Sequence, residues 1–271
     1  MQTIIFPTDF SKGAEKAMEF AIEVARRTDA KIIAVNAYDL PYAETIMTHS
    51  LLDVMKKNAE DAMAKVAEKL KSAGVNYSTE IKMGNPIRVV KEAVEDFNAD
   101  MVVLGTKGAS GLEEVLIGSN AAAILHNVDC PVLSIPQGKA FSEINHIVYG
   151  SDFRSKKADK ALGELKTVAA LFDAKITVAH VVVNYDIDDK ILAEAKARIS
   201  PILEPVKHEY EVLHADSVEE GILDYAAKHG ADMVALMSRN YSFFEGLFRR
   251  SISSKVAYHA SIPYLALQET R

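Results

Sequence analysis

The stretch Asn98-Ala99-Asp100-Met101-Val102-Val103-Leu104 returns, little changed, as Gly230-Ala231-Asp232-Met233-Val234-Ala235-Leu236. A second pair of matching stretches lies ahead of these, Ile5-Phe6-Pro7-Thr8-Asp9-Phe10 in the first half and Val148-Tyr149-Gly150-Ser151-Asp152-Phe153 in the second. Each contains a short apolar run of the kind that forms a buried strand. The sequence therefore predicts one domain written twice.

The length of the chain agrees with two domains. It has 271 residues, whereas single cores commonly hold about 100 to 150 residues. We expect the first domain at residues 1–138 and the second at residues 144–271. The boundary is expected in the polar, turn-rich connector 136–143.

Short apolar runs alternate with longer helical patterns in both copies. This alternation favours a parallel sheet with helices on both faces. The predicted fold class is α/β, with two tandem, doubly wound, Rossmann-like domains, each having a five-stranded parallel sheet of strand order 3-2-1-4-5. The expected strands are 3–7, 31–37, 77–82, 100–105 and 131–135, then 147–150, 174–181, 207–213, 232–236 and 263–267. The expected helices include 12–27, 44–72, 86–97, 111–126 and 187–203.

Composition narrows the class of partner. Hydrophobic residues make up 49% of the chain and charged residues 25%, which is typical of a globular protein. The net charge of -7 weighs against binding to nucleic acid or to an anionic membrane surface. There is one cysteine and no apolar run long enough for a membrane span or a signal peptide, so we expect a cytoplasmic protein.

The candidate site lies where the sheet reverses its winding. In the expected strand order, strands one and four are neighbours across that reversal, and ligands of open parallel sheets bind beyond the carboxyl ends of such strands. Asp9 follows strand one, and Gly105-Thr106-Lys107-Gly108-Ala109-Ser110-Gly111 follows strand four. We therefore expect Asp9 and the glycine loop to face each other over one cleft.

The chemistry of this loop suits an anion. Glycines let backbone N–H groups approach phosphate, Lys107 adds a positive charge, and a helix start at about Gly111 or Gly118 offers free N–H groups. Asp9 is then placed to hold a sugar, a base edge or a divalent cation. The loop has neither the Walker nor the dinucleotide motif, and by itself it is equally compatible with a tight connection.

The second copy departs from the first at the glycines. Met237, Asn240 and Arg250 stand where Gly105, Gly108 and Gly118 stood. This difference predicts one ligand site per chain. The aromatic and basic run 241–250 follows in the second copy, and we favour packing of its rings into the vacated cleft over a loop for partners or anions.

These motifs together resemble a known family. The spacing Gly105-x-x-Gly108, nine residues, then Gly118-Ser119 combines with Pro7-Thr8-Asp9-Phe10-Ser11 at the first strand and Cys130-Pro131-Val132-Leu133 at the last. In this combination the chain resembles the universal stress protein family in its ATP-binding branch. The duplication is similar to that of tandem universal stress proteins, and the resemblance covers nearly the whole chain.

The resemblance implies a nucleotide site for ATP, with magnesium as its expected companion. Asp9 and the backbone at Thr8 would hold adenine and ribose, Ala37 would line the base pocket, and the glycines would cradle the phosphates. Lys107 stands where the family often has histidine, which leaves its contact open. The implied nucleotide-binding residues are Pro7, Thr8, Asp9, Ala37, Gly105, Lys107, Gly108, Gly118, Ser119 and Asn120.

The family also pairs domains through the fifth strand. The resemblance therefore implies that residues 131–135 and 263–267 form a contact between the two copies or between two chains, the latter giving a homodimer.

The expected function is an ATP-binding regulatory module of the stress response with little or no turnover. The alternatives are a slow ATPase or phosphotransferase that uses Asp9 with a divalent metal, and a scaffold without nucleotide. No catalytic residue and no metal ligand set are predicted. The eight histidines show no short paired metal spacing, and there is no Gly-x-Ser-x-Gly motif.

Overall fold

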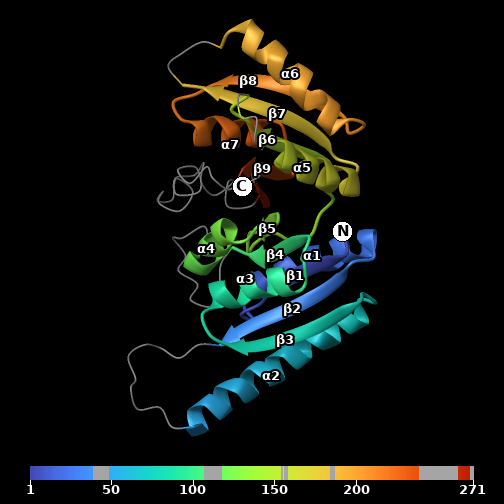
Figure 1. Ribbon diagram of the computed structural model, residues 1–271, viewed down its shortest axis with the longest axis vertical. Coiled ribbons are helices and arrows are strands. Elements are labelled where there is room, and N and C mark those ends of the chain that lie inside the picture. Colours follow the sequence, from blue (N-terminus) through green and yellow to red (C-terminus); the bar gives the residue numbers. More distant parts are fainter. Residues whose placement is uncertain are drawn as a thin grey trace.

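The computed structural model describes residues 1–38, 49–106, 118–153, 155, 158–183, 187–237 and 262–268 (Figure 1). The first half contains β1 (Thr3–Pro7), α1 (Lys12–Thr28), β2 (Lys31–Tyr38), α2 (His49–Ser72), β3 (Tyr77–Met83), α3 (Pro86–Asp96), β4 (Met101–Gly105), α4 (Ser119–Asn127) and β5 (Val132–Ile135). The second half contains β6 (His146–Gly150), α5 (Asp159–Phe172), β7 (Lys175–Val182), α6 (Asp189–Leu203), β8 (His208–His214), α7 (Val218–Lys228), β9 (Met233–Met237) and β10 (Tyr264–Leu267).

The strands form one ten-stranded sheet of order β3-β2-β1-β4-β5-β10-β9-β6-β7-β8. Each half of this sheet has the order 3-2-1-4-5 counted from its own first strand, and its five strands run parallel. The predicted fold class is confirmed. The two sheets are nevertheless continuous, which alternation of strand and helix could not reveal.

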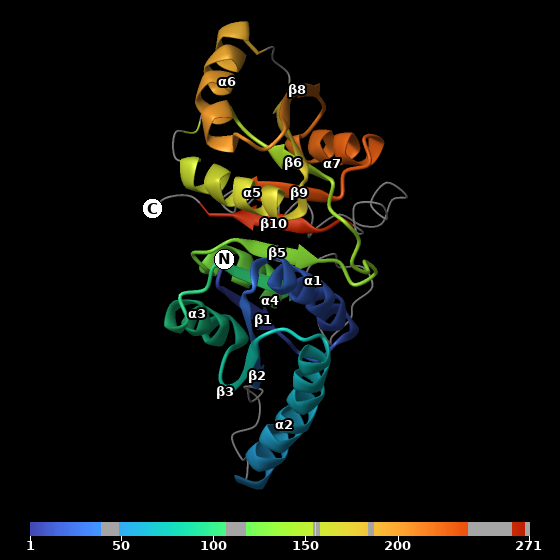
Figure 2. The same ribbon diagram turned by 90° about the vertical axis from the view of Figure 1, so that its right-hand side faces the viewer.

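The fifth strands of the two halves join the sheets. β10 runs antiparallel to β5, with Leu265 opposite Leu133 and Tyr264 opposite Ser134, and the two strands lie side by side in Figure 2. Each strand therefore has a neighbour on both sides, β4 and β10 for β5, and β5 and β9 for β10. The contact expected between the two copies through the fifth strands is confirmed, and it takes place within one chain. The expected homodimer stays a prediction, and this pairing leaves neither edge of these strands open for it.

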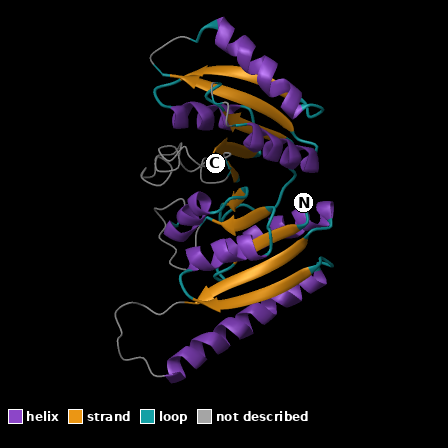
Figure 3. Ribbon diagram, in the orientation of Figure 1, coloured by secondary structure: helices purple, strands orange, loops and turns teal. Residues whose placement is uncertain are grey.

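Helices cover both faces of the sheet (Figure 3). Residues of α1, α2, α5 and α6 belong to one buried cluster, which includes Phe20 and Leu165. Residues of α3, α4 and α7 belong to another on the opposite face, which includes Val90 and Ile222. β1 and β4 are buried from both sides because apolar side chains alternate between the two clusters.

Local sequence explains where the helices near the pocket begin and end. Ser11 caps α1, since its Oγ accepts a hydrogen bond from the N–H of Ala14 at 3.2 Å, and Asp29 ends the helix in the left-handed conformation. Asn85 caps α3 ahead of Pro86, which suits the first helical turn because it needs no N–H there.

Two expected helices are shorter in the described part of the chain. α2 begins at His49 rather than at residue 44, and α4 begins at Ser119 rather than at residue 111. Residues 39–48 and 107–117, which precede them, lie outside the described ranges.

The connector between the halves is anchored to α1, which also contacts the second half. Arg27 of α1 donates to both carboxylate oxygens of Glu143 at 2.8 Å, and its guanidinium lies 4.9 Å from the centre of the Phe172 ring in the second half. Phe141 packs edge-on against Phe20, with 5.1 Å between ring centres. These contacts, together with the β5–β10 pairing, hold the two halves in one arrangement.

Candidate functional site

The turn after β1 is held by hydrogen bonds at every step. The N–H of Thr8 donates to the carbonyl of Val35 at 2.9 Å, which extends the β1–β2 pairing beyond the end of β1. The N–H of Phe10 donates to Thr8 Oγ1, and the N–H of Ser11 donates to Asp9 Oδ1, both at 3.1 Å. The turn therefore has one defined shape, and the exposed Asp9 stands at its tip.

A buried amide also contacts this turn. Asn36 of β2 is 5% exposed, and its Nδ2 donates to the carbonyl oxygen of Thr8 at 2.8 Å. Asn36 is not among the site residues expected from the sequence. Its signal was a polar side chain inside the apolar run of β2, because a polar group is buried at low cost only when it is hydrogen-bonded.

Gly105 is a glycine because helix α1 packs against the end of β4. A Cβ atom at this position would lie 2.6 Å from both the carbonyl carbon and the carbonyl oxygen of Gly13, and 3.0 Å from the nitrogen of Ala14. Those atoms are backbone, which cannot rotate aside. The packing of α1 on β4 thus accounts for Gly105 without reference to a ligand, and the close approach of two glycines was not foreseen from the sequence.

Gly118 is a glycine for a different reason. Its φ is -68°, which any residue adopts. Among the described residues, a Cβ atom there would meet only the carbonyl oxygen of Thr106, at an ordinary 3.5 Å. Neither backbone conformation nor packing against the described parts of the fold therefore requires a glycine at this position.

Gly118 is the residue from which α4 starts. Its N–H donates to the carbonyl of Thr106 at 2.6 Å, and its own carbonyl receives the N–H of Ala122. It provides no side-chain cap. The first backbone N–H groups of a helix have no partner inside the helix, and together with the helix dipole they favour an anion. The missing side chain of Gly118 leaves this helix end accessible.

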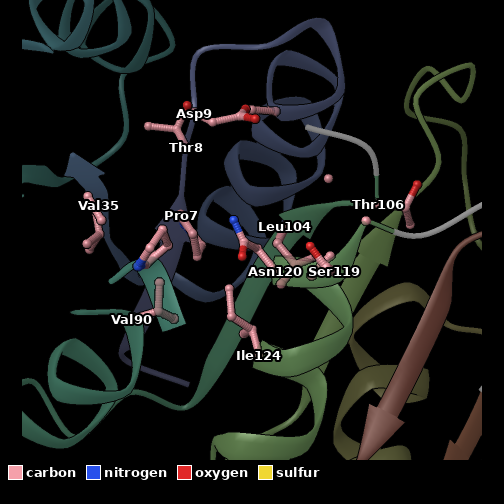
Figure 4. Close-up of a pocket in the computed structure, with 16 residues that line it drawn as sticks. Pro7, Thr8, Asp9, Val35, Val90, Leu104, Thr106, Ser119, Asn120 and Ile124 are labelled. Atoms are coloured by element: carbon pink, nitrogen blue, oxygen red, sulfur yellow. The ribbon is translucent and has the colours of Figure 1, made fainter. Parts of the chain in front are cut away.

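These elements enclose one pocket, shown in Figure 4. The carboxyl ends of β1, β2 and β4 meet the first turns of α1, α3 and α4 there. Its polar part is formed by Asp9, Thr106, Ser119 and Asn120, and its apolar wall includes Val35. The full lining is Pro7, Thr8, Asp9, Ala14, Val35, Ala37, Pro86, Val90, Leu104, Gly105, Thr106, Gly118, Ser119, Asn120, Ala121 and Ile124.

The structure brings together most of the site residues expected from the sequence. Eight of them line this pocket: Pro7, Thr8, Asp9, Ala37, Gly105, Gly118, Ser119 and Asn120. Lys107 and Gly108 lie outside the described residues. The contribution of α3, through Pro86 and Val90, was not foreseen. Within the described ranges, no group of three or more His, Cys, Asp or Glu side chains is arranged to hold a metal ion.

The second half repeats the turn with other side chains. The carbonyl of Ser151 contacts Nδ1 of His180 at 2.8 Å, as the carbonyl of Thr8 contacts Asn36. Phe153 has a φ of 60°, close to the 63° of Phe10. The fold of the turn is therefore the same in both halves.

The space beyond that turn is filled differently. Val181 stands at the place of Ala37 and is 5% exposed. A Cβ atom on Gly221 of α7 would lie 2.9 Å from its two methyl groups. At Gly150, a Cβ would lie 2.6 Å from the side chain of Leu236. Apolar side chains thus occupy the position in the second half that corresponds to the apolar wall of the pocket.

The remaining expectations for the second half concern Met237, which is described, and residues that lie outside the described ranges. Met237 ends β9 and is buried, at the position that corresponds to Gly105. Asn240, Arg250 and the aromatic run 241–250 lie outside the described ranges, so their expected packing into the cleft stays a prediction.

None of the helices in the described ranges is both long and apolar enough to cross a bilayer.

Comparison with known proteins identifies the family. The model of the universal stress protein family matches residues 1–136 and again residues 143–268. A universal stress protein of Methanocaldococcus jannaschii is 33% identical over 140 residues, which cover 50% of this chain and 82% of that protein. The crystal structure of a universal stress protein from Archaeoglobus fulgidus DSM 4304 superimposes with a TM-score of 0.76, over 98% of this chain and 96% of that one, at 21% identity. The latter likeness concerns the fold. The chain belongs to the universal stress protein family and carries the family's domain twice.

Proposed function

We propose that the first domain binds ATP in the pocket between β1, β4 and α4, and that the second domain has no equivalent site. The observation that carries the proposal is Gly118. It leaves the uncapped start of α4 accessible although neither its φ nor its packing against described residues requires a glycine, and it lines the same pocket as Asp9. A residue without a side chain at this point would let an anion approach the backbone N–H groups of the first turn of α4.

The two ends of the pocket suit the two ends of a nucleotide. The N–H groups of the first turn of α4, which have no partner inside the helix, suit phosphate oxygens together with the hydroxyl of Ser119 and the amide of Asn120. The apolar wall at Ala37 and Val90 suits the face of a base. Asp9, which stands on the rigid turn, suits the ribose hydroxyls as a hydrogen-bond acceptor. Magnesium would accompany the phosphates and neutralise part of their charge.

Binding is favoured over turnover by the kind of groups present. Backbone N–H groups and small polar side chains stabilise phosphate without activating water, and a hydrolase needs a positioned base or nucleophile. We therefore propose that the bound nucleotide sets the conformation of the protein, or its choice of partner, in the cytoplasmic stress response. The proposal does not include a dimer through the fifth strands, because β5 and β10 already pair within the chain.

The test is to purify the full chain, denature it and measure the released nucleotide by chromatography and mass spectrometry. About one ATP per chain is expected, and titration of the stripped protein with ATP and magnesium should give the same stoichiometry. Two ATP per chain would show that the second domain binds as well. A predominance of ADP that is lost in the Asp9→Ala variant would favour the slow ATPase instead. No binding at millimolar ATP would refute the proposal and leave a scaffold.

A further inference from the structure

We infer that Asn36 is a positioning residue of the first domain's site, which holds the Thr8–Asp9 peptide so that the Asp9 carboxylate faces the pocket. Asn36 itself does not line the pocket. The inference rests on the proposed nucleotide site. It means that a buried residue of β2, outside the pocket lining, contributes to the binding of ATP.

The first step is the geometry of one peptide plane. Nδ2 of Asn36 lies 2.8 Å from the carbonyl oxygen of Thr8. A peptide unit is planar, so a fixed carbonyl oxygen also fixes the direction of the following N–H and the position of the Asp9 Cα atom. The preceding peptide is held through the bond from the Thr8 N–H to Val35. Asp9 is thereby oriented from the amino-terminal side.

The second step is the backbone strain next to Asp9. Phe10 has a φ of 63°, a left-handed conformation that is unfavourable for a bulky residue and persists only where surrounding contacts impose it. The described contacts around it include the bonds to Thr8 Oγ1 and Asp9 Oδ1, the bond from Asn36 to the Thr8 carbonyl, and the packing of the Phe10 side chain against the core. Without the donor from Asn36, the carbonyl would lie buried without this partner and the turn would lose its anchor on β2.

The third step comes from the second domain, which has kept the bond while changing the residue. His180 places Nδ1 2.8 Å from the carbonyl oxygen of Ser151. A carbonyl oxygen only accepts, so this nitrogen carries the proton. Phe153 then shows the same left-handed backbone. Two chemically different side chains thus supply the same donor, which indicates that the turn requires a donor rather than an asparagine.

This difference provides matched variants. Asn36→Leu keeps the number and branching of the side-chain heavy atoms and removes the donor, whereas Asn36→His introduces the donor that the second domain uses. His180→Asn makes the reverse change in the domain without the proposed site. For each variant we would measure the ATP dissociation constant by calorimetry, well below the melting temperature.

Asn36→Leu is expected to raise the dissociation constant about tenfold, the effect of one lost hydrogen bond of ordinary strength. Asn36→His should restore it to within about twofold of the parent, and His180→Asn should leave it unchanged. In the Asp9→Ala background, Asn36→Leu should cost no further affinity, because a positioning residue acts only through the group that it positions. An unchanged dissociation constant for Asn36→Leu, or full additivity with Asp9→Ala, would overturn the inference.

Amide hydrogen exchange in the nucleotide-free protein separates this inference from the proposed function. Asn36→Leu should speed exchange at Phe10 and Ser11, whose N–H groups make the two bonds of the turn, and Asn36→His should not. A parent protein that never binds ATP would refute the proposed function. Equal exchange at Phe10 and Ser11 in all variants would refute the hold on the turn, whether or not ATP binds.

Discussion

The two domains have nearly the same backbone at the end of their first strand and different side chains around it. Both place a phenylalanine in the left-handed region, and both hold the carbonyl two residues earlier by a buried side-chain donor at 2.8 Å. The described space beyond this turn is a pocket in the first domain, while apolar side chains are packed there in the second. The shape of the turn is thus a property of the fold, and the ability to bind depends on what surrounds it.

The two domains also differ at the end of strand four, where a contact between two glycines is found in the first domain. In the first domain Gly105 approaches Gly13 so closely that neither a side chain nor a backbone shift can be accommodated easily. In the sequence, Lys12-Gly13-Ala14 matches Lys156-Lys157-Ala158, and Met237 corresponds to Gly105. Both glycines of the contact have therefore been replaced together. The second domain therefore does not keep the pair of glycines that this contact needs in the first domain.

The largest effect is expected where the comparison is sharpest, at Gly118. Gly118→Arg introduces the residue that the second domain has at Arg250. Its side chain would cover the start of α4, so the ATP dissociation constant should rise at least about a thousandfold, or ~4 kcal/mol. The circular dichroism spectrum and melting temperature should stay near those of the parent, because no described atom clashes with a Cβ there. The matched control is Gly138→Arg in the connector, where a Cβ would have no described atom within 4 Å. Retained ATP binding would mean that the phosphates lie elsewhere.

Gly105→Met should affect stability before binding. It introduces the second domain's Met237 while α1 keeps its close approach to β4, so the new Cβ is forced against backbone atoms of Gly13 at 2.6 Å. We expect the unfolding free energy of the first domain to fall by about 3 kcal/mol, the upper range for overpacking. Hydrogen exchange of the β1 and β4 amides in the global unfolding limit measures it. If the variant were as stable as the Gly138→Met control, the packing of α1 on β4 would not require a glycine at this position.

Ala37→Val should have a smaller effect on the base end of the pocket. Valine is the residue of the second domain at this position, and its two methyl groups would narrow the pocket beside its apolar wall. An increase of about tenfold in the ATP dissociation constant is expected, or ~1.4 kcal/mol. Val181→Ala, the reverse change, should create no ATP site, because Ile222 and Leu236 remain beside Gly150. Calorimetry of both variants decides this, and a second site in Val181→Ala would show that one residue closes the second domain.

The smallest effect is a pH dependence confined to the second domain. Burial, and next the charge of Lys175, lower the pKa of His146 below its ordinary value, and Nε2 of His146 lies 2.8 Å from Thr177 Oγ1. The folded state therefore takes up the proton less readily than the unfolded state. As pH falls below about 6.5, the unfolding free energy of the second domain should decrease, because the unfolded state takes up the proton first.

The first domain has Thr3 at the matching position and should lack this contribution to the pH dependence. Comparing exchange of β6 and β1 amides at pH 7.5 and pH 5.5 tests the difference. His146→Gln is the control that removes the titrating group, and it should remove the extra loss in β6. The charged groups that face His146 are Lys175, Glu209 and Asp232, and an unchanged slope in this variant would contradict the assignment of the pH dependence to His146.

Much of the fold could be predicted because it depends on local patterns that occur twice. Apolar runs such as Met101-Val102-Val103-Leu104 mark strands buried on both faces, and the alternation with helices leaves few possible topologies. Asp9 and the residues after strand four could be assigned to one cleft, since the carboxyl ends of neighbouring parallel strands meet at one edge of a sheet. The repeat then made the missing glycines of the second copy visible.

The role of particular residues could not be predicted in the same way. The glycine at 105 belongs to a contact with Gly13, which lies 92 positions away in the chain. Asn36 donates a hydrogen bond to the carbonyl of Thr8, 28 positions away, and the sequence around Asn36 does not indicate which group accepts it. Contacts of this kind depend on how helices and strands pack, and sequence spacing does not encode them.

The sequence by itself determined that this protein is a duplicated α/β chain in which only the first copy has a glycine loop. Hydrophobic periodicity and the backbone freedom of glycine are properties of the residues themselves. Only the tertiary structure decided that the two sheets are one, through the antiparallel pairing of β5 with β10. It also decided which glycine serves packing and which leaves the helix end open. Those distinctions depend on distances between atoms far apart in the chain, which exist only once the chain has folded.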